Sequence, residues 1–200
     1  QWHTAAEPPY SLPKACNRMP FTPFHMGAGL ALKAVAGRHF SVLTFGIAQV
    51  AMDIEPLVGM LRGAAVLHGP THTYLGAVPI ALATAVLAPW LCRPLLRRWN
   101  LEVQHHRVAW LIEAEQWRPG TVLLSALAGT WSHVVLDSVM HADITPWAPW
   151  SDANGLYAWV SLSTLHGLCV AGMVAGAAAW VARRWLGRKR PGIGASHTPP

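Results

Sequence analysis

The feature of this sequence that most limits its possible folds is a set of long apolar stretches. Residues 156–182 contain no Asp, Glu, Lys or Arg, and neither do residues 74–92. A helix needs about 20 mostly apolar residues to cross a membrane. Both stretches meet this requirement, so we expect the chain to lie in a membrane.

Two further stretches are long enough to cross a membrane if their few carboxylates are accommodated. Residues 121–140 include one Asp, residues 41–61 include one Asp and one Glu, and residues 23–36 are apolar but short. The sequence therefore predicts an all-α integral membrane bundle with four full transmembrane helices and a shorter N-terminal helix. Composition agrees, because 12% of the residues are charged, against about a quarter in an average soluble domain.

The two ends of the chain differ from its middle. Residues 1–18 are polar and contain no apolar stretch of the kind found in a signal peptide. Because Met19 opens a natural protein start, we expect residues 1–18 to be a disordered leader or a mis-assigned start. Residues 187–200 are basic and then rich in Gly, Pro and Ser, which predicts a disordered tail. One membrane-embedded domain, residues 19–186, lies between them.

Positively charged side chains predict the orientation of the helices. Arg residues gather in residues 93–119 and again in residues 183–190, and two predicted helices separate these clusters. Both clusters therefore lie on one side of the membrane, which should be cytoplasmic together with the C-terminus. Since topology accounts for the net charge of +6, we expect membrane lipid rather than nucleic acid as a partner.

Ionisable side chains from five segments are predicted to meet at one level, in the outer half of the membrane. Nothing in the assignment of the spans required this coincidence. Such groups are costly inside a membrane and usually functional. The set comprises His25, Asp53, Glu55, His68, His72, His133, Asp137, His141 and His166.

Part of this set has the spacing of metal ligands on a helix. His133 and Asp137 are four residues apart, as are Asp137 and His141, so all three share one helix face. Imidazole together with carboxylate suits zinc, iron or manganese. Taken alone, Asp137 could instead pair with His133 and lock two helices together. Groups from five segments at one level favour a metal or catalytic centre.

The other candidates differ in how they approach the cluster. Asp53 and Glu55 are about 200° apart on a regular helix, so only one of them should face the cluster unless Pro56 distorts the turn. Asp53 is favoured as a ligand, and Glu55 as a base, an orienting group or a rim residue. Pro70 is expected to begin the next helix, so His68 should approach from the preceding loop, ahead of His72.

The number of candidate ligands exceeds the needs of one ion, because a tetrahedral zinc takes four. The predicted ligands are His25, Asp53, His68, His72, His133, Asp137, His141 and His166. Either two or more ions bind, or some members orient the ligands. We therefore predict a divalent metal cofactor of one to three ions, zinc in the first place and manganese or iron as alternatives. Glu55 and His68 are expected to assist catalysis by a metal-activated water.

Four stretches of the chain also resemble a known family. They are MPFTPFHMGAGLALKA, AQVAMDIEPL, LHGPTHTYLGA and GTWSHVVLDSVMHADITPWAPW, and the resemblance covers about residues 19–182. The chain is similar to the YdjM-like family of bacterial inner-membrane proteins, which are described as metal-dependent hydrolases. The resemblance implies an inner-membrane location and a site at His25, Asp53, His68, His72, His133 and Asp137.

Two details of the resemblance bear on the substrate. Gly69 stands where many YdjM-like members have Arg, which indicates a subgroup. The order of the His and Asp blocks is also similar to that of zinc-dependent phospholipase C, which suggests a phosphoester substrate. The predicted function is therefore hydrolysis of a small-molecule or lipid phosphoester, or of a lipid-linked ester, at the outer side of the membrane.

Two other classes of function remain open from the sequence. One is a metal-binding or metal-transporting membrane protein without hydrolysis, although residues 77–92 and 167–182 offer no ionisable group for a route to the cytoplasm. The other is a structural membrane protein whose polar cluster is a hydrogen-bonded core, which would bind no metal.

Overall fold

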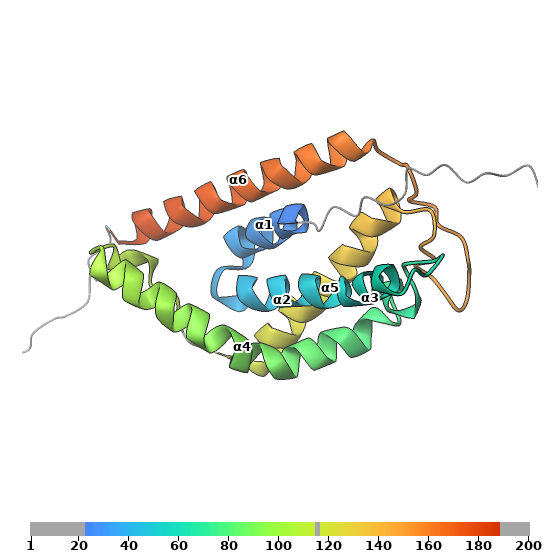
Figure 1. The fold of residues 1–200 in the computed structure, drawn as a ribbon. Coiled ribbons are helices and arrows are strands. Elements are labelled where there is room, and N and C mark those ends of the chain that lie inside the picture. The colour runs from blue at the N-terminus through green and yellow to red at the C-terminus, as the bar shows by residue number, and fades with distance from the viewer. Residues whose placement is uncertain (1–22, 115–116, 189–200) are drawn as a thin grey trace, which may run out of the picture.

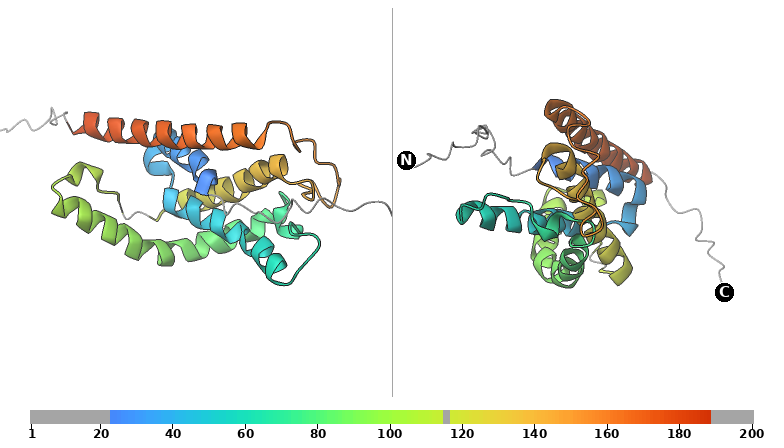
Figure 2. Two further views of the ribbon diagram at one scale, coloured as in Figure 1. Left: turned by 45° about the horizontal axis from the view of Figure 1, so that its top comes forward. Right: turned by 90° about the vertical axis from the view of Figure 1, so that its right-hand side faces the viewer.

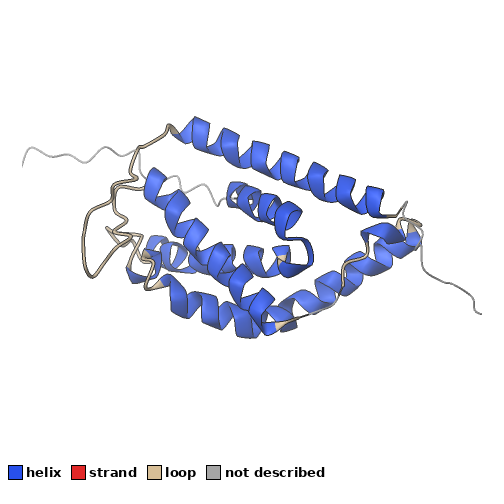
Figure 3. Ribbon diagram, turned by 180° about the vertical axis from the view of Figure 1, so that it is seen from behind, coloured by secondary structure: helices blue, strands red, loops and turns tan. Residues whose placement is uncertain are grey.

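The computed structural model describes residues 23–114 and 117–188, and the regular elements in these ranges are helices (Figures 1 and 3). The α-helices are α1 Met26–Ala36, α2 Val42–Met52, α3 Ile54–Leu61, α4 Ala77–His105, α5 Pro119–Met140 and α6 Leu162–Gly187. Short 3-10 segments are η1 Pro23–His25, η2 Gly37–His39, η3 Pro70–His72 and η4 Ala109–Leu111.

The predicted fold class is confirmed. In the described part of the chain, four helical stretches are long and apolar enough to cross a membrane, namely Val42–Leu61, α4, α5 and α6. Helix α1 rises only about 16 Å at 1.5 Å per residue, which is too short for a hydrocarbon core of about 30 Å. The predicted leader, residues 1–18, and most of the predicted tail lie outside the described residues, but Gly187 is the last residue of α6.

The predicted span at residues 41–61 is interrupted in its middle. Helix α2 begins after Ser41, whose side chain accepts a hydrogen bond from the Thr44 amide at 3.2 Å, and it ends at Met52. Pro56 has no amide hydrogen to donate to the Met52 carbonyl, and its ring would clash with that carbonyl in a regular helix. The chain therefore breaks at Asp53 and resumes as α3, which projects from the side of the bundle (Figure 2).

Two other predicted spans end later than expected. The span at residues 74–92 continues as α4 to His105, and the span at 156–182 begins at Leu162 and continues to Gly187. Arg is a good helix former, and its long side chain can extend to the membrane surface. A cluster of Arg residues thus ends an apolar stretch without ending the helix. Helix α4 bends along its length (Figure 1) and contains Pro89 and Pro94, the usual cause of such a bend.

Small residues allow close packing between the helices. Helix α5 packs against α2 and α4, and α1 packs along α6. A Cβ atom added at Gly27 of α1 would overlap the backbone of Cys169 in α6, and one at Gly176 of α6 would overlap the backbone of α1. Close backbone approach through small residues is the usual way in which membrane helices associate. This contact fixes α1, and with it His25 at the start of α1, inside the bundle.

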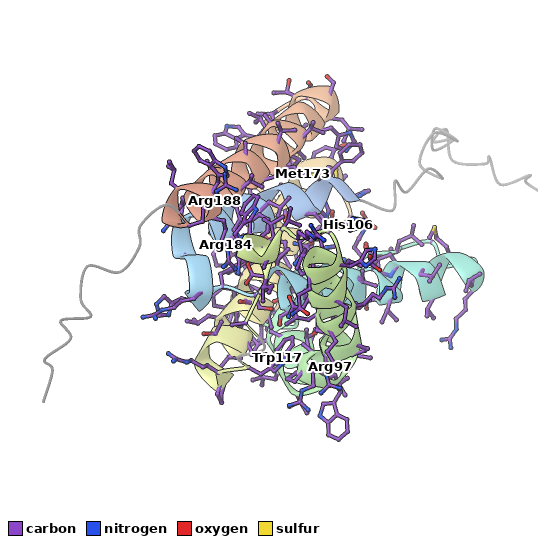
Figure 4. The ribbon with its side chains drawn as sticks, turned by 90° about the vertical axis from the view of Figure 1, so that its left-hand side faces the viewer. Arg97, His106, Trp117, Met173, Arg184 and Arg188 are labelled. Atoms are coloured by element: carbon purple, nitrogen blue, oxygen red, sulfur yellow. The ribbon has the colours of Figure 1, made fainter. Side chains whose placement is uncertain are left out.

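A cluster around Glu113 holds the opposite end of the bundle together. One Glu113 carboxylate oxygen accepts from Arg184 Nη2 at 2.7 Å and from Trp180 Nε1 at 3.2 Å, and the other accepts from Lys33 Nζ at 3.2 Å. Asn100 bonds both backbone polar groups of Glu113. Figure 4 views the molecule from this end, where α4 and α6 carry their Arg side chains. The Glu113 cluster thus joins α1, α4 and α6.

Candidate metal centre

The predicted cluster assembles at the end of the bundle opposite to Glu113. The last turns of α5, the break between α2 and α3, and the connections before α4 and after α5 all lie at this end (Figure 1). Helix α5 supplies two of the residues, and η1, η3 and the α2–α3 break bring the others against it. Buried there are His25, Asp53, His68, His72, His133 and Asp137.

Asp137 is the residue on which the histidines converge. Its Oδ1 lies 3.5 Å from His25 Nε2, and its Oδ2 lies 3.1 Å from His133 Nε2 and 3.6 Å from His72 Nε2. His133 Nε2 is also 3.5 Å from Asp53 Oδ1. Three Nε2 atoms from η1, η3 and α5 therefore surround one buried carboxylate.

Gln49 fixes the orientation and tautomer of His133. The Gln49 side-chain nitrogen donates to the Gly129 carbonyl at 3.1 Å and to Ser132 Oγ at 3.0 Å. Because a carbonyl can only accept, the amide oxygen of Gln49 must be the atom 2.7 Å from His133 Nδ1. His133 Nδ1 therefore carries a proton, and in the neutral ring the lone pair is on Nε2.

Glu55 fixes the orientation and tautomer of His72. One Glu55 oxygen lies 3.3 Å from His72 Nδ1 and accepts hydrogen bonds from the Gly69 amide and from the amide and hydroxyl of Thr71. The carboxylate thus orders the loop before α4 as well as the imidazole. Burial lowers the pKa of His72 to about 4, so at neutral pH its ring is uncharged with the proton on Nδ1 and a lone pair on Nε2.

Asp143 orients a third imidazole ring, that of His68. His68 Nδ1 lies 2.9 and 3.0 Å from the two Asp143 oxygens, and the amides of Leu67 and His68 donate to the same carboxylate. Burial alone would raise the pKa of Asp143, but the neighbouring His68 outweighs it and the pKa is lowered. Asp143 is therefore a carboxylate that accepts a hydrogen bond from His68 Nδ1, and in the neutral ring this places the lone pair on His68 Nε2.

The lone pairs face one another without donors between them. The Nε2 atoms of His68, His72 and His133 and both ring nitrogens of His25 are buried without a hydrogen-bond partner among the described residues. Buried polar atoms are normally paired, and an imidazole lone pair about 3 Å from a carboxylate oxygen is repulsive. Protonating every ring would bury several positive charges. Bound cations would give the Nε2 atoms the partners that the described side chains do not.

Donor atoms in the described residues form three groups that are close enough to hold an ion. Within each group the ligand atoms lie within 4.8 Å of one another. The groups are His25, His133 and Asp137; His68, His72 and Asp137; and His68, His141 and Asp143. The first two are fully buried, whereas Asp143 in the third is exposed.

Two sequence predictions about local geometry can be judged here. Asp53 and Glu55 both contact the cluster, which is the outcome expected if Pro56 distorts the turn. The break at Asp53 removes the regular helix on which only one of them would face the cluster. Pro70 begins η3, and His68 approaches from the loop before it, as predicted.

His141 and His166 lie at the margin of the cluster. His141 follows the last residue of α5, and its ring centroid is 4.3 Å from that of His68. His166 stacks on Phe24 with ring centroids 4.6 Å apart, and it belongs to none of the three groups in the part of the chain that the structure describes. The geometry thus separates these two from the predicted ligands that surround Asp137.

Gln49 and Asp143 were missed from the sequence. Gln49 had a usable signal, because it is a polar residue in an apolar stretch and lies four residues before Asp53, on the same helix face. Asp143 follows His141 by two residues, but its pairing with His68 depends on how two distant loops fold together.

Comparisons with known proteins support a family assignment without a named activity. The sequence model of a family described as a domain of unknown function, DUF4184, matches residues 19–190. Comparisons with curated proteins and with solved structures give no match. Because the family match covers well over half of the chain, this protein belongs to the DUF4184 family.

Proposed function

We propose that this protein is a membrane-bound, metal-dependent hydrolase that acts on a phosphoester or a lipid-linked ester. His25, Asp53, His68, His72, His133 and Asp137 are the candidate ligands. A divalent ion bound by such residues lowers the pKa of a water ligand to about 7 and so supplies hydroxide at neutral pH. Hydrolysis then adds water across the ester and releases an acid and an alcohol.

One observation supports the metal centre above all others. His68, His72 and His133 come from separate segments, yet each has an oxygen acceptor on Nδ1 and a buried, unpartnered Nε2. Histidines that bind metals almost always show this arrangement, because the acceptor fixes the tautomer and directs the lone pair at the ion. In a hydrogen-bonded structural core the Nε2 atoms would have partners of their own.

The proposed substrate and location follow from the surroundings of the centre. Apolar helices that can face lipid carry the site, so an ester embedded in the bilayer can approach it. The Arg-rich ends of α4 and α6 lie at the opposite end of the bundle (Figure 4). The positive-inside rule then assigns the C-terminus to the cytoplasm and the centre to the outer side of a bacterial inner membrane. The phosphoester class rests on the similarity to YdjM-like proteins and to zinc-dependent phospholipase C.

The test combines metal content with hydrolysis. The full chain is purified in detergent without a histidine tag, loaded with zinc, and given p-nitrophenyl phosphate, bis-p-nitrophenyl phosphate, p-nitrophenyl acetate and a short-chain phosphatidylcholine. We expect zinc-dependent hydrolysis of at least one probe. Asp137→Asn, which removes the central charge with little change in shape, should lower the rate by more than the about 10–100-fold that is typical of losing a residue that only orients a ligand.

Asp152→Asn is the matched control, because Asp152 is exposed in the connection between α5 and α6. It should leave both the zinc content and the rate unchanged. Full zinc content and full turnover in Asp137→Asn would refute the proposed centre. Stable zinc binding without hydrolysis of any probe would instead favour the metal-binding or metal-transport alternative.

A further inference from the structure

Five donors of the candidate centre divide into two groups that share one residue. The first group is His25, His133 and Asp137, and the second is His68, His72 and Asp137. Among the residues that the structure describes, no group whose ligand atoms all lie within 4.8 Å of one another contains all five. The donors are therefore arranged around two positions rather than one.

Coordination chemistry leads to the same division. Zinc–nitrogen bonds are about 2.0–2.1 Å long, so two nitrogens on one ion lie at most about 4.2 Å apart. A tetrahedral zinc also accepts four ligands, which is fewer than the five donors present. A single ion would leave at least one buried imidazole nitrogen without a partner, and buried polar atoms of this kind are rare.

Asp137 is oriented to serve both positions. Its Oδ1 lies 3.5 Å from His25 Nε2 of the first group, and its Oδ2 lies between the groups, 3.1 Å from His133 Nε2 of the first and 3.6 Å from His72 Nε2 of the second. Paired ions in hydrolytic enzymes lie about 3.5–4 Å apart, a separation that the two oxygens of one carboxylate can bridge. We propose that the chain binds two divalent ions bridged by Asp137, one on His25 and His133 and the other on His68 and His72.

This inference rests on the proposed function, because it concerns the same centre, and it assigns different roles to the two ions. Asp53 Oδ1 lies 3.5 Å from His133 Nε2, so Asp53 borders the first position, although it is not one of the three donors that group together there. The second ion has three protein ligands, and its His68 is bonded to the exposed Asp143. Closed sites are typically structural, and catalytic sites keep one position open. The second position, whose His68 is bonded to the exposed Asp143, would therefore be the one to keep a place for a water ligand.

The first experiment counts ions by elemental mass spectrometry in the zinc-loaded full chain. We expect two equivalents in the unchanged protein and one in each of His25→Ala and His72→Ala. His105→Ala is the matched control, because His105 ends α4 at the far end of the bundle and is exposed, and it should keep two. One or three equivalents in the unchanged protein, or loss of both ions from either single variant, would overturn the assignment.

The second experiment needs no variant and so avoids any folding defect. The full chain is loaded with manganese(II), and its electron paramagnetic resonance spectrum is recorded. Two ions that share a carboxylate should give an exchange-coupled spectrum, whereas two uncoupled ions would overturn the bridge. One ion with hydrolysis intact refutes the pair but not the proposed function. A coupled pair without hydrolysis of any probe supports the pair and refutes the proposed function.

Discussion

The two ends of the bundle each gather charged side chains from several helices, and they satisfy them in different ways. At the Glu113 cluster, both carboxylate oxygens accept hydrogen bonds, from Lys33, Arg184 and Trp180. At the candidate metal centre, the acceptors on the Nδ1 side are equally well placed, but the Nε2 atoms facing Asp137 have no hydrogen-bond partner in the described ranges. In the first network both carboxylate oxygens have partners, and in the second several imidazole nitrogens have none among the described residues.

This difference separates a structural network from a binding site. A buried polar network contributes to stability when every member has a partner, and it costs free energy when some do not. The Glu113 cluster joins α1, α4 and α6 and needs nothing further. At the candidate metal centre, the contacts to Nδ1 orient the imidazole rings, and the Nε2 atoms remain available to bind an ion. Variants at the two ends should therefore change different measured quantities, and the four predictions below run from the largest expected effect to the smallest.

Gln49→Leu should have the largest effect, and the effect should fall on metal binding. Without the Gln49 oxygen, His133 Nδ1 loses the acceptor that lies 2.7 Å away, and the ring loses its fixed tautomer. Loss of such an orienting partner typically weakens metal binding by about 10–100-fold, and we expect the upper end because both residues are buried. Competition with a chromogenic zinc chelator measures this.

Ser132→Ala is the control for Gln49, because it removes one acceptor of the Gln49 side chain and leaves the contact with His133. Its zinc affinity should change by less than about threefold, since the orienting partner of the metal ligand remains. Equal losses in the two variants would mean that general packing, and not the tautomer of His133, governs zinc binding.

Glu113→Ala should have the opposite profile. The Lys33 side chain is only 11% exposed and that of Glu113 23%, so removing Glu113 leaves a nearly buried ammonium without its carboxylate. Breaking a fully buried pair costs about 3–5 kcal/mol; because water reaches Glu113, we expect about 2 kcal/mol. Titration with sodium dodecyl sulfate in mixed micelles measures the unfolding. The zinc content should stay the same, and a loss of zinc would show that the two ends are coupled.

Much of this arrangement could be predicted from the sequence. The length of each apolar stretch, and the position of the polar residues along it, follow directly from the order of the residues. Residues 121–140 match α5 closely, and Asp137 and His133 follow from spacing on that helix. The sequence indicated a distortion at Pro56 only as an alternative, because the effect of Pro56 on the preceding carbonyl had to be weighed against an otherwise regular apolar helix.

Contacts between distant loops were beyond the reach of sequence reasoning. Asp143 and His68 are 75 residues apart, and their pairing depends on the conformation of two connections that no periodic pattern describes. Gln49 lies on a predictable helix face, but its role depends on the Gly129 carbonyl, which fixes its amide. The sequence thus indicates which groups meet, and the structure adds which atom of each is already engaged.

Asp143→Asn should weaken zinc binding by about tenfold, the lower end of the range for orienting partners. The Asp143 side chain is 35% exposed, so water can replace part of its contact with His68, and an Asn oxygen can still accept the Nδ1 proton. If two ions bind, the loss should fall on one equivalent, and chelator titration should become biphasic. An equal weakening of both ions would argue against separate positions for His68 and His25.

Arg98→Ala should have the smallest effect. It tests whether charge alone stabilises the Arg-rich end of the bundle. Arg98 Nη2 lies 2.5 Å from Glu102 Oε1, which looks favourable, but the two side chains are 77% and 42% exposed. Exposed ion pairs one helical turn apart contribute about 0.3–0.5 kcal/mol, so the unfolding midpoint should barely move, and the zinc content should not change. A loss as large as that of Glu113→Ala would mean that the charge of the Arg-rich end, and not the completed bonds of the Glu113 cluster, stabilises it. The comparison between the two ends would then have to be drawn on electrostatic grounds instead of on satisfied and unsatisfied atoms.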